Sequence, residues 1–538
     1  MKKLVSLLLA LTMILSTGIL TVASAEDARP VITIAREANT LIEDYDTNEF
    51  TLMLEETLGV DIQVEIFSEA ATKLNLLVAG NSELPDIINF KLDDATIAQY
   101  GATGVFQPLN DYFANPELAV NFQKMDKSVQ DTILGGSRMA DGNNYSMPLL
   151  GEYFPNYVSF HLLVNKTWLE KLNMEVPKTT EEFRAMLEAF AANDMNGNGK
   201  KDEIPMMGCT NGFGSNPAAV LLNSFLPANP TKNYFYPQNG EIKAAFMQDE
   251  FKAGLEYVRG LVADGLLDAA SFTQTLDQFK AIINQDEAVV GVLNIGNYDV
   301  PFNKPTDPKP GYLVQWDHPI GSQYVYMDYP VGPEGKVYIP YNPATPSQLF
   351  FITKDCDNPE LAFKLGDLGY DPLNSLWSRH GTEPENWTSD PEVLKNYRGP
   401  NINGVALEPK WALLNDPWTS AQNKHWMQTY PGHFSIAFNL YRGASIDAKA
   451  SYMELVYALD SHKVPEEYIV KLSYTADELD ELAFMQTAVN DYVKECVTAF
   501  ATGNMDIQKD WDRYINELKA MDVERYIEIM QASYDRTK

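Results

Sequence analysis

The chain has 538 residues and a formal net charge of −33, with 45% apolar residues and three cysteines. The strong negative charge argues against nucleic acid and anionic membrane surfaces as partners, because both are themselves anionic. Three cysteines in so long a chain exclude a disulfide framework, since at most one pair can form among Cys209, Cys356 and Cys496. The composition is that of an ordinary globular protein, and the length predicts two or three domains.

Residues 1–25 have the organisation of a secretory signal peptide. Lys2 and Lys3 precede an apolar run from Leu4 to about Leu15, and small residues end in Ala23-Ser24-Ala25. The run is too short to span a bilayer, and no later stretch has the roughly 18 apolar residues that a spanning helix requires. No cysteine near the predicted cleavage site offers a lipid-anchor attachment point. We therefore expect an exported protein that is extracellular, cell-surface associated or periplasmic.

The first part of the mature chain alternates strand and helix signals. Apolar runs predict strands at 31–34, 62–66 and 86–90, separated by helices that end near Leu58 and that cover 70–79. This β-α-β-α-β order implies a parallel sheet with helices on both faces. The fold class predicted from the sequence is therefore α/β.

A second run of the same kind begins near Tyr157 and continues through a helix from Thr167. Further strands are predicted at 288–293 and 349–353, with irregular Pro- and Gly-rich loops over 301–346. From about Asn358 the chain is predicted to be mainly helical.

The C-terminal region is predicted to hold three amphipathic helices. The capping box Thr475-Ala-Asp-Glu478 begins the first, and Gly503-Asn504 ends it. Two more follow around 511–521 and 523–534. The apolar face of the first helix is formed by Leu479, Leu482, Met485, Val489, Val493, Cys496 and Phe500.

The segment from Asp194 to Glu203 places oxygen-bearing side chains at alternate positions of a glycine-rich turn. Ca²⁺ takes about six to eight hard oxygen ligands, and this alternation allows a loop to wrap such an ion. The first three positions match an EF-hand, but Pro205 occupies the twelfth, so the loop is not that of a calcium sensor. The alternative is a polar Asn/Gly turn. The predicted ligands are the side chains of Asp194, Asn196, Asn198, Asp202 and Glu203 with the carbonyl of Lys200.

A predicted amphipathic helix leads into this loop. Thr179-Thr-Glu-Glu182 offers a capping box, and apolar residues recur at helical spacing up to Phe190. A bound cation would clamp the C-terminal end of that helix. Because no nucleophile or acid/base constellation lies beside the loop in sequence, we assign the predicted Ca²⁺ a structural role.

Seven short blocks follow one another along the chain: Leu58-Gly-Val-Asp-Ile62, Ser82-Glu-Leu-Pro-Asp-Ile-Ile88, Asp141-Gly-Asn-Asn-Tyr-Ser-Met-Pro148, Val164 to Asn173, the loop at 194–203, His380-Gly-Thr-Glu-Pro-Glu-Asn-Trp387 and an ending from Asp510 to Asp535. In this order they resemble the family 1 extracellular solute-binding proteins of carbohydrate ABC transporters, in particular the alginate-binding and LplA/LipO-like branch. The resemblance covers essentially the whole mature chain.

The resemblance implies a two-lobed fold of the periplasmic-binding-protein type II class, with crossing hinge segments, a helical C-terminal region and closure of the lobes on a ligand. It predicts an N-terminal lobe of residues 26–152 and 287–354. The C-terminal lobe would hold 153–286 and 355–538. Crossings are expected near 150–156, 286–290 and 353–357.

The same resemblance implies site residues. The calcium ligands of the family match the six positions between Asp194 and Glu203 one for one. A sugar-contacting glutamate and an aromatic of the family correspond to Glu383 and Trp387, although Pro384 stands where the family usually has glycine. The chain also departs from the Gram-positive members, which are usually lipoproteins.

Further ligand contacts are sought among aromatic and polar loop residues, because carbohydrate receptors stack aromatic rings on sugars and bind their hydroxyls with polar side chains. For the tryptophans the alternative is the core, and for the other residues a solvated loop. The further candidates are Trp411, Trp418, Asn297, Tyr298, Phe90, Lys91 and Asp93.

The leading interpretation is a monomeric binding protein that captures an oligosaccharide and delivers it to the permease of an ABC transporter, without catalysis. One alternative is an exported polysaccharide-degrading enzyme, which would need two carboxylates at a set separation. No catalytic motif organises the acidic residues, and histidine is scarce. A second alternative is an oligopeptide-binding protein of the same architecture.

Overall fold

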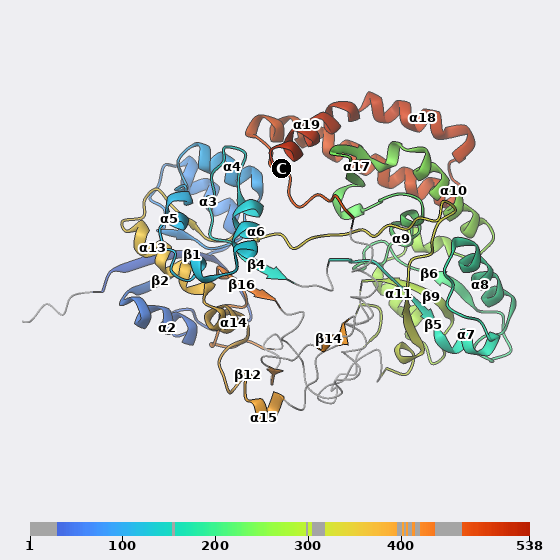
Figure 1. Cartoon of the computed structure of the whole chain (residues 1–538), viewed down its shortest axis with the longest axis horizontal. Helices are drawn as coiled ribbons and strands as arrows, with labels where there is room; N and C mark the ends of the chain where they lie inside the picture. The colour runs from blue at the N-terminus through green and yellow to red at the C-terminus, as the bar shows by residue number, and fades with distance from the viewer. Residues whose placement is uncertain are drawn as a thin grey trace, which may run out of the picture.

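The computed structural model describes residues 29–152, 157–296, 300–303, 318–394, 401–402, 405–406, 412–414, 420–435 and 465–537. Figure 1 shows two α/β bodies side by side, joined by segments that cross between them. We name the body that contains β1 (Val31–Glu37) the first lobe and the body that contains β5 (His161–Asn165) the second lobe. The predicted signal peptide, Asn297, Tyr298, Trp411 and Trp418 lie outside the described residues.

The first lobe is built on a four-stranded sheet in the order β11-β3-β1-β2. The first three strands in sequence pair in parallel, as predicted, and β11 adds an antiparallel edge. The bounds of the other strands are β2 Asp61–Phe67, β3 Ile87–Ile88 and β11 Phe351–Ile352. A separate parallel pair joins β4 (Leu149–Glu152) to β16 (Gly432–Ser435).

Helices cover this sheet and share its core. Their bounds are α2 Glu49–Leu58, α3 Ala70–Ala79, α4 Asp94–Ala102, α5 Asn110–Ala114, α6 Lys127–Ser137, α13 Pro359–Asp367 and α14 Pro372–His380. Asn48 caps α2 by accepting the N–H of Phe50, and Gly59 ends it at a φ of 67° that glycine adopts at little cost. Ile34, Phe50 and Phe363 belong to one buried cluster, so α13 is part of the first lobe.

The second lobe has its own four-stranded sheet, in the order β10-β5-β9-β6. β5 runs antiparallel to both of its neighbours, and β6 runs parallel to β9. The bounds are β6 Ile204–Met207, β9 Val290–Ile295 and β10 Tyr324–Met327, with a hairpin of β7 Phe235–Gln238 and β8 Glu241–Ala244 outside the sheet.

Eight named helices pack in or against the second lobe. Their bounds are α7 Lys166–Leu172, α8 Thr180–Ala192, α9 Pro217–Leu221, α10 Asp249–Ala263, α11 Leu276–Ile283, α17 Ala476–Thr502, α18 Ile507–Ala520 and α19 Val523–Asp535. Thr475 and Glu478 form the predicted reciprocal capping box, and Gly503 ends α17 at a φ of 82°. Most of the predicted apolar face of α17, from Leu482 to Phe500, packs in the core of this lobe and α17 contacts α10, and Figure 1 shows α17 to α19 along the top of this lobe.

The assignment of segments to lobes differs from the predicted one. Residues 287–354 were expected in the N-terminal lobe, but β9 and β10 pair with β5 in the second lobe. Residues 355–538 were expected in the C-terminal lobe, but α13, Trp426 and Tyr430 pack in the core of the first. An apolar strand or helix pattern shows that a segment is buried, not which of two cores buries it.

The crossings follow from these pairings. The chain passes between the lobes after β4, between β10 and β11, and between β16 and α17. Val158 and Tyr341 form an isolated bridge, so the first two crossing segments lie side by side. The crossing predicted near 150–156 falls between β4 and β5, mostly on residues 153–156, which lie outside the described residues. Those predicted near 286–290 and 353–357 are wrong, because β9 belongs to the second sheet and Thr353 bridges Phe106 within the first lobe.

Two smaller expectations concern membranes and cysteines. Among the described helices, none is long and apolar enough to cross a membrane. Cys209, Cys356 and Cys496 all carry free thiols, and Cys496 is buried on the apolar face of α17, as predicted.

Two-stranded ribbons join β12 Trp387–Thr388 to β15 Ala412–Leu413 and β13 Asn401–Ile402 to β14 Val405–Ala406, with α15 at Pro391–Leu394.

Candidate functional site

The end of the β4–β16 pair brings together two polar side chains from distant parts of the sequence. Nε2 of His433 lies 2.9 Å from Oε2 of Glu152, although 281 residues separate them. Both side chains are partly exposed. Because β4 leads directly into the first crossing segment, the pair lies where the first lobe ends.

The C-terminal end of α14 brings a cation over an aromatic ring of β16 at this position. The guanidinium of Arg379 lies 4.8 Å from the centroid of the Phe434 ring, a cation–π distance. Its Nε donates to Nε2 of His380 at 3.0 Å. Asp371 caps α14 and Pro372 occupies its first turn, so the N-terminus of the helix that carries Arg379 is stabilised.

Two tyrosines lie on the segments that cross from the first lobe to the second. The rings of Tyr157 and Tyr341 have centroids 6.0 Å apart and meet edge to face. Burial, and then the charge of Glu152, raise the pKa of Tyr157, so its hydroxyl stays neutral. We name Glu152, Tyr157, Tyr341, Arg379, His433 and Phe434 the junction cluster. The pairs Glu152–His433 and Arg379–Phe434 lie at the end of the first lobe, the pair Tyr157–Tyr341 lies on the crossing segments, and the charge of Glu152 acts on Tyr157.

The second lobe presents a buried histidine at the adjoining end of its sheet. Nδ1 of His161 lies 3.1 Å from the carbonyl oxygen of Gly296, and its ring meets Tyr326 edge to face. Burial lowers the pKa of His161 to about 4, so the ring is neutral near pH 7. Asn297 and Tyr298, two predicted ligand contacts, follow Gly296 directly but lie outside the described residues.

The predicted contacts after β3 have local roles in the first lobe. Phe90 is 4% exposed and packs against Phe67 in the core. Asp93 caps α4 by accepting the N–H of Thr96 at 2.7 Å. Lys91 is exposed. The structure does not bring these three residues into contact with the junction cluster.

Glu383 and Trp387 lie on the loop that follows α14. The Glu383 carboxylate is exposed and accepts the hydroxyl of Ser389 at 2.8 Å. The Trp387 ring is 6% exposed, and its Nε1 donates to the carbonyl of Gly381 at 2.8 Å. Trp387 therefore packs inside the loop whose outer side carries Glu383, and ligand contact by either residue stays a prediction.

The junction cluster itself was mostly missed by sequence reasoning. Of its members only Glu152 fell within an earlier prediction, that of the crossing near 150–156. His433 and Arg379 carry no local motif that marks them, since their meeting depends on strand pairing across hundreds of residues. The one sequence signal that could have drawn attention to His433 is the scarcity of histidine, because the chain has only six histidines.

The predicted calcium loop joins α8 to β6 in a tight, self-bonded turn. The Asp194 carboxylate accepts the N–H of Gly197 at 2.7 Å and of Gly199 at 2.9 Å, and both glycines have φ near 80°. Nδ2 of Asn198 donates to Asp202 at 3.1 Å and to Glu287 at 3.2 Å. This bond from Asn198 lowers the pKa of Asp202.

The donor atoms of the loop are of the chemical type that binds a hard cation. Three carboxylates and two side-chain amides with a backbone carbonyl offer only oxygen ligands, which Ca²⁺ prefers. Within the described residues no group of three or more His, Cys, Asp or Glu side chains is arranged to hold a metal ion by itself. Binding at this loop would therefore depend on the amide oxygens of Asn196 and Asn198 as well.

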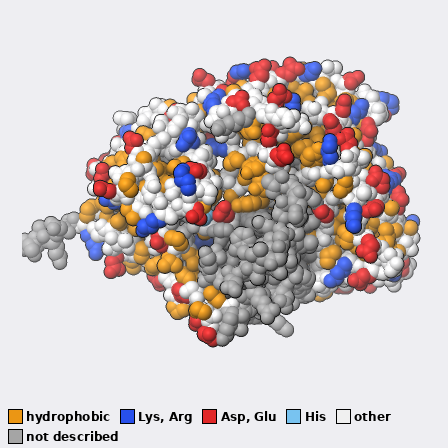
Figure 2. Space-filling view, viewed as in Figure 1, with side chains coloured by type: hydrophobic (Ala, Val, Ile, Leu, Met, Phe, Trp, Pro, Cys, Tyr) orange, Lys and Arg blue, Asp and Glu red, His pale blue; other side chains and the backbone are white. Residues whose placement is uncertain are grey.

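The visible face of the molecule carries acidic and basic side chains interspersed over both lobes (Figure 2). On the described residues of this face there is no continuous basic stripe of the kind that a nucleic-acid backbone requires.

Comparisons with known proteins agree with this architecture. The fructooligosaccharide ABC transporter substrate-binding protein FusA of Streptococcus pneumoniae is 26% identical over 527 residues, which cover 93% of this chain and 89% of FusA. The fold is shared with a solute-binding protein of Bifidobacterium longum infantis described as binding HMO (TM-score 0.74, 21% identity, 95% and 99% of the two chains).

Two further structures share the fold. One is a FusA EF-hand mutant in complex with fructo-nystose (TM-score 0.67, 22% identity, 94% and 99% covered). The other is the alginate-binding protein AlgQ2 without calcium ion (TM-score 0.61, 17% identity, 95% and 98% covered). The profile of the family described as bacterial extracellular solute-binding protein matches residues 41–372, more than half of the sequence, and this chain belongs to that family.

Proposed function

We propose that this protein binds an oligosaccharide between its lobes and delivers it to the membrane permease of an ABC transporter. The observation that carries the proposal is the junction cluster, which combines aromatic rings, a cation and a carboxylate where the two lobes meet. The kinship with FusA over nearly the whole chain supports the same class of ligand.

The chemistry of the junction cluster suits a sugar. Pyranose and furanose rings have C–H faces that pack on aromatic rings such as Tyr157, Tyr341 and Phe434. Their hydroxyls donate to a carboxylate such as that of Glu152 and accept from a guanidinium such as that of Arg379. A peptide ligand would draw chiefly on backbone pairing, which these side chains do not offer.

Closure of the lobes would complete the site. Tyr157 and Tyr341 lie on adjacent crossing segments, so a rotation of one lobe about them changes the distance from Glu152 to the second lobe. Hinge closure around a ligand is a common mechanism in two-lobed binding proteins. The lobe division that we propose for this motion is the one given by the two sheets.

The residues predicted from sequence as ligand contacts are proposed to bind the oligosaccharide in addition to the junction cluster. Glu383 carries an exposed carboxylate that accepts the hydroxyl of Ser389. Contact by Trp387, Phe90, Lys91 and Asp93, and by Asn297, Tyr298, Trp411 and Trp418, is proposed on the resemblance alone.

We also propose that the loop from Asp194 to Glu203 holds a structural Ca²⁺. The ligands would be Asp194, Asn196, Asn198, the carbonyl of Lys200, Asp202 and Glu203. The FusA structure is described as an EF-hand mutant and the AlgQ2 structure as being without calcium ion, and both descriptions support the assignment. The ion would join the end of α8 to the start of β6 and to Glu287 before β9.

Within this proposal the protein acts outside the cell, as a monomer and without catalysis, in keeping with a family of solute-binding proteins. Titration calorimetry of the purified protein against neutral oligosaccharides, uronate oligomers and short peptides tests the ligand class. A reducing-end assay on the same samples tests for turnover.

The expected result is saturable binding of an oligosaccharide with no release of reducing ends. Binding of peptides alone would overturn the ligand class. Turnover that follows protein concentration and disappears on replacing a single carboxylate would overturn the transport function.

A further inference from the structure

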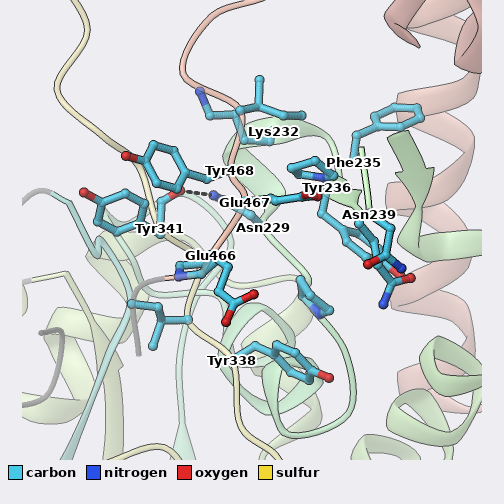
Figure 3. Close-up of a pocket in the computed structure, with 16 residues that line it drawn as sticks. Asn229, Lys232, Phe235, Tyr236, Asn239, Tyr338, Tyr341, Glu466, Glu467 and Tyr468 are labelled. Carbon is cyan, nitrogen blue, oxygen red and sulfur yellow. Dashed lines mark hydrogen bonds between the residues drawn. The ribbon is translucent and has the colours of Figure 1, made fainter. Parts of the chain in front are cut away.

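A cavity of about 350 Å³ opens on the second lobe beside two crossing segments (Figure 3). Its lining comes from residues 227–239, which include β7, from 338–341 and from 465–469. None of these residues belongs to the first lobe. The cavity, which we name the hinge pocket, is therefore distinct from the junction cluster, although Tyr341 belongs to both.

Aromatic side chains form the walls of the hinge pocket. Figure 3 shows Tyr341 and Tyr468 together on one side and Phe235 with Tyr236 on the other. The rings of Tyr341 and Tyr468 have centroids 4.9 Å apart and planes at 71°, so one ring supports the other edge to face. Paired rings of this kind offer rigid faces against which an aliphatic C–H surface can pack.

The polar groups around these rings include donors and acceptors. Asn229 is held in place by its donation to the carbonyl of Tyr341 at 3.1 Å. Glu467 accepts the N–H of Gly240 at 3.1 Å, while Glu466 is exposed at the rim. Each carboxylate keeps lone pairs that can accept further hydroxyl protons.

Lys232 is the least satisfied of these groups. Its side chain is partly withdrawn from water, and desolvation lowers its pKa. Its ammonium makes no ion pair or hydrogen bond to another side chain in the described part of the molecule. A charged donor in such surroundings gains free energy from any ligand oxygen that accepts from it.

We propose that the hinge pocket is a second binding site, and that it takes the ring of a neutral sugar. The volume lies within the range of small-molecule pockets. Aromatic walls suit the C–H faces of the ring, and Lys232 with the two glutamates suits its hydroxyls. One lysine against two carboxylates leaves the pocket negative, which disfavours an acidic sugar.

Occupancy of the hinge pocket is linked to the arrangement of the lobes. Tyr341 lies on the second crossing segment, and Tyr468 lies on the segment that leads into α17. A ligand that binds these rings better in one arrangement favours that arrangement, and the coupling between the two sites is reciprocal.

Ligand-observed saturation-transfer NMR on the full-length mature protein tests the site, with glucose, fructose and galacturonate as separate probes. The variants are Lys232→Met and Tyr468→Leu. Lys364→Met is the control, because it replaces a partly buried lysine on α13 of the first lobe. The titrations are repeated in a Glu152→Gln background, so that sugar bound between the lobes contributes least.

The expected result is saturable binding of glucose or fructose that weakens about tenfold in Lys232→Met and in Tyr468→Leu, with no change in Lys364→Met. Lys232→Met decides the matter if Tyr468→Leu fails to fold. Equal affinity in Lys232→Met and wild type, absence of saturation by any neutral sugar, or tighter binding of galacturonate would each overturn the proposal.

This outcome is separable from the function between the lobes. Oligosaccharide affinity measured by calorimetry should fall in Glu152→Gln and persist in Lys232→Met. Loss in neither variant would count against the junction cluster and leave the NMR result for the hinge pocket standing on its own.

Discussion

His433 and Glu152 meet at 2.9 Å across the ends of the two parallel strands β16 and β4. The imidazole and the carboxylate thus occupy the border of the first lobe. Their side chains are partly exposed, so their contact contributes little to the stability of the fold.

Replacing the carboxylate of this pair should separate binding from stability. We expect Glu152→Gln to weaken oligosaccharide binding by about 1.5–3 kcal/mol, because it removes a charged acceptor. The free energy of unfolding should change by less than about 1 kcal/mol, because the pair is partly solvated. Calorimetry and urea unfolding measure the two. The control Glu65→Gln removes an exposed partner of Lys73 on the first lobe and should change neither.

Removal of calcium should lower the melting temperature. An ion that binds only the folded protein and is present at about 100 times its Kd contributes about 2.7 kcal/mol. The variant Asp202→Asn should melt lower and lose its response to chelator, whereas Asp131→Asn on the exposed side of α6 should keep both properties. If metal analysis finds no calcium and chelator leaves the melting curve unchanged, the loop is a polar turn and not a metal site.

Local sequence patterns predicted many of the helices and strands, although the region from about Asn358, predicted to be mainly helical, carries β12 to β16 among its described residues. The helix at 70–79 has the predicted bounds, and the capping box at Thr475 is formed as expected. At Thr179 half of the predicted box is present: its hydroxyl accepts the N–H of Glu182, but the Glu182 carboxylate accepts from Lys178 instead. These features depend on residues a few positions apart, which a sequence displays directly.

Features that depend on distant pairing were not predictable in the same way. The membership of β9 in the second sheet follows from its register with β5, more than a hundred residues earlier. The meeting of Glu152 with His433 has the same origin. The calcium loop could be proposed from ten consecutive residues, whereas the junction cluster required the fold.

A contact between the lobes involves Lys471 and Asp94. The ammonium lies 3.5 Å from the carboxylate; the Lys471 side chain is 10% exposed and that of Asp94 42%. Gln348 also donates to Asp94 at 2.9 Å. Desolvation lowers the pKa of Lys471, and the charge of Asp94 opposes that shift.

This geometry predicts an asymmetric response to mutation. Asp94→Asn leaves a buried ammonium without its counter-charge and should cost about 1–2 kcal/mol of stability, less than a fully buried pair would because Asp94 is half exposed. Lys471→Met replaces the cation by an apolar chain and should be nearly neutral. Urea unfolding of both variants measures the difference; a larger cost for Lys471→Met would contradict the assignment of the buried member.

Two buried histidines predict a loss of stability in mild acid. Burial lowers the pKa of His161 and of His425 to about 4, below the value of about 6.5 expected in the unfolded chain. Between these values the unfolded state binds the proton and the folded state does not. Stability should therefore fall as pH decreases from about 6.5 toward 4, by about 2 kcal/mol per histidine between pH 7 and pH 5.

The variant His161→Gln should remove about half of that pH dependence, whatever it does to the stability at pH 7. Urea midpoints across pH 5 to 7 measure the slope. His433→Gln, which replaces a partly exposed histidine, is the matched control. An unchanged slope in His161→Gln would show that other groups carry the acid sensitivity.

The loop after α14 allows the roles of Trp387 and Glu383 to be separated. The Trp387 ring is 6% exposed and bonded to Gly381, so Trp387→Ala should cost about 3–5 kcal/mol of stability, whereas Trp387→Phe should recover most of it. Glu383→Gln changes an exposed carboxylate and should leave unfolding within about 0.5 kcal/mol of wild type. If Glu383 contacts the ligand, its variant should weaken oligosaccharide binding by about 1–2 kcal/mol, while Glu385→Gln on the same loop should not. Full affinity in Glu383→Gln would remove that residue from the site. Near-normal unfolding of Trp387→Ala with lost affinity would make the ring a ligand platform instead of a packing residue.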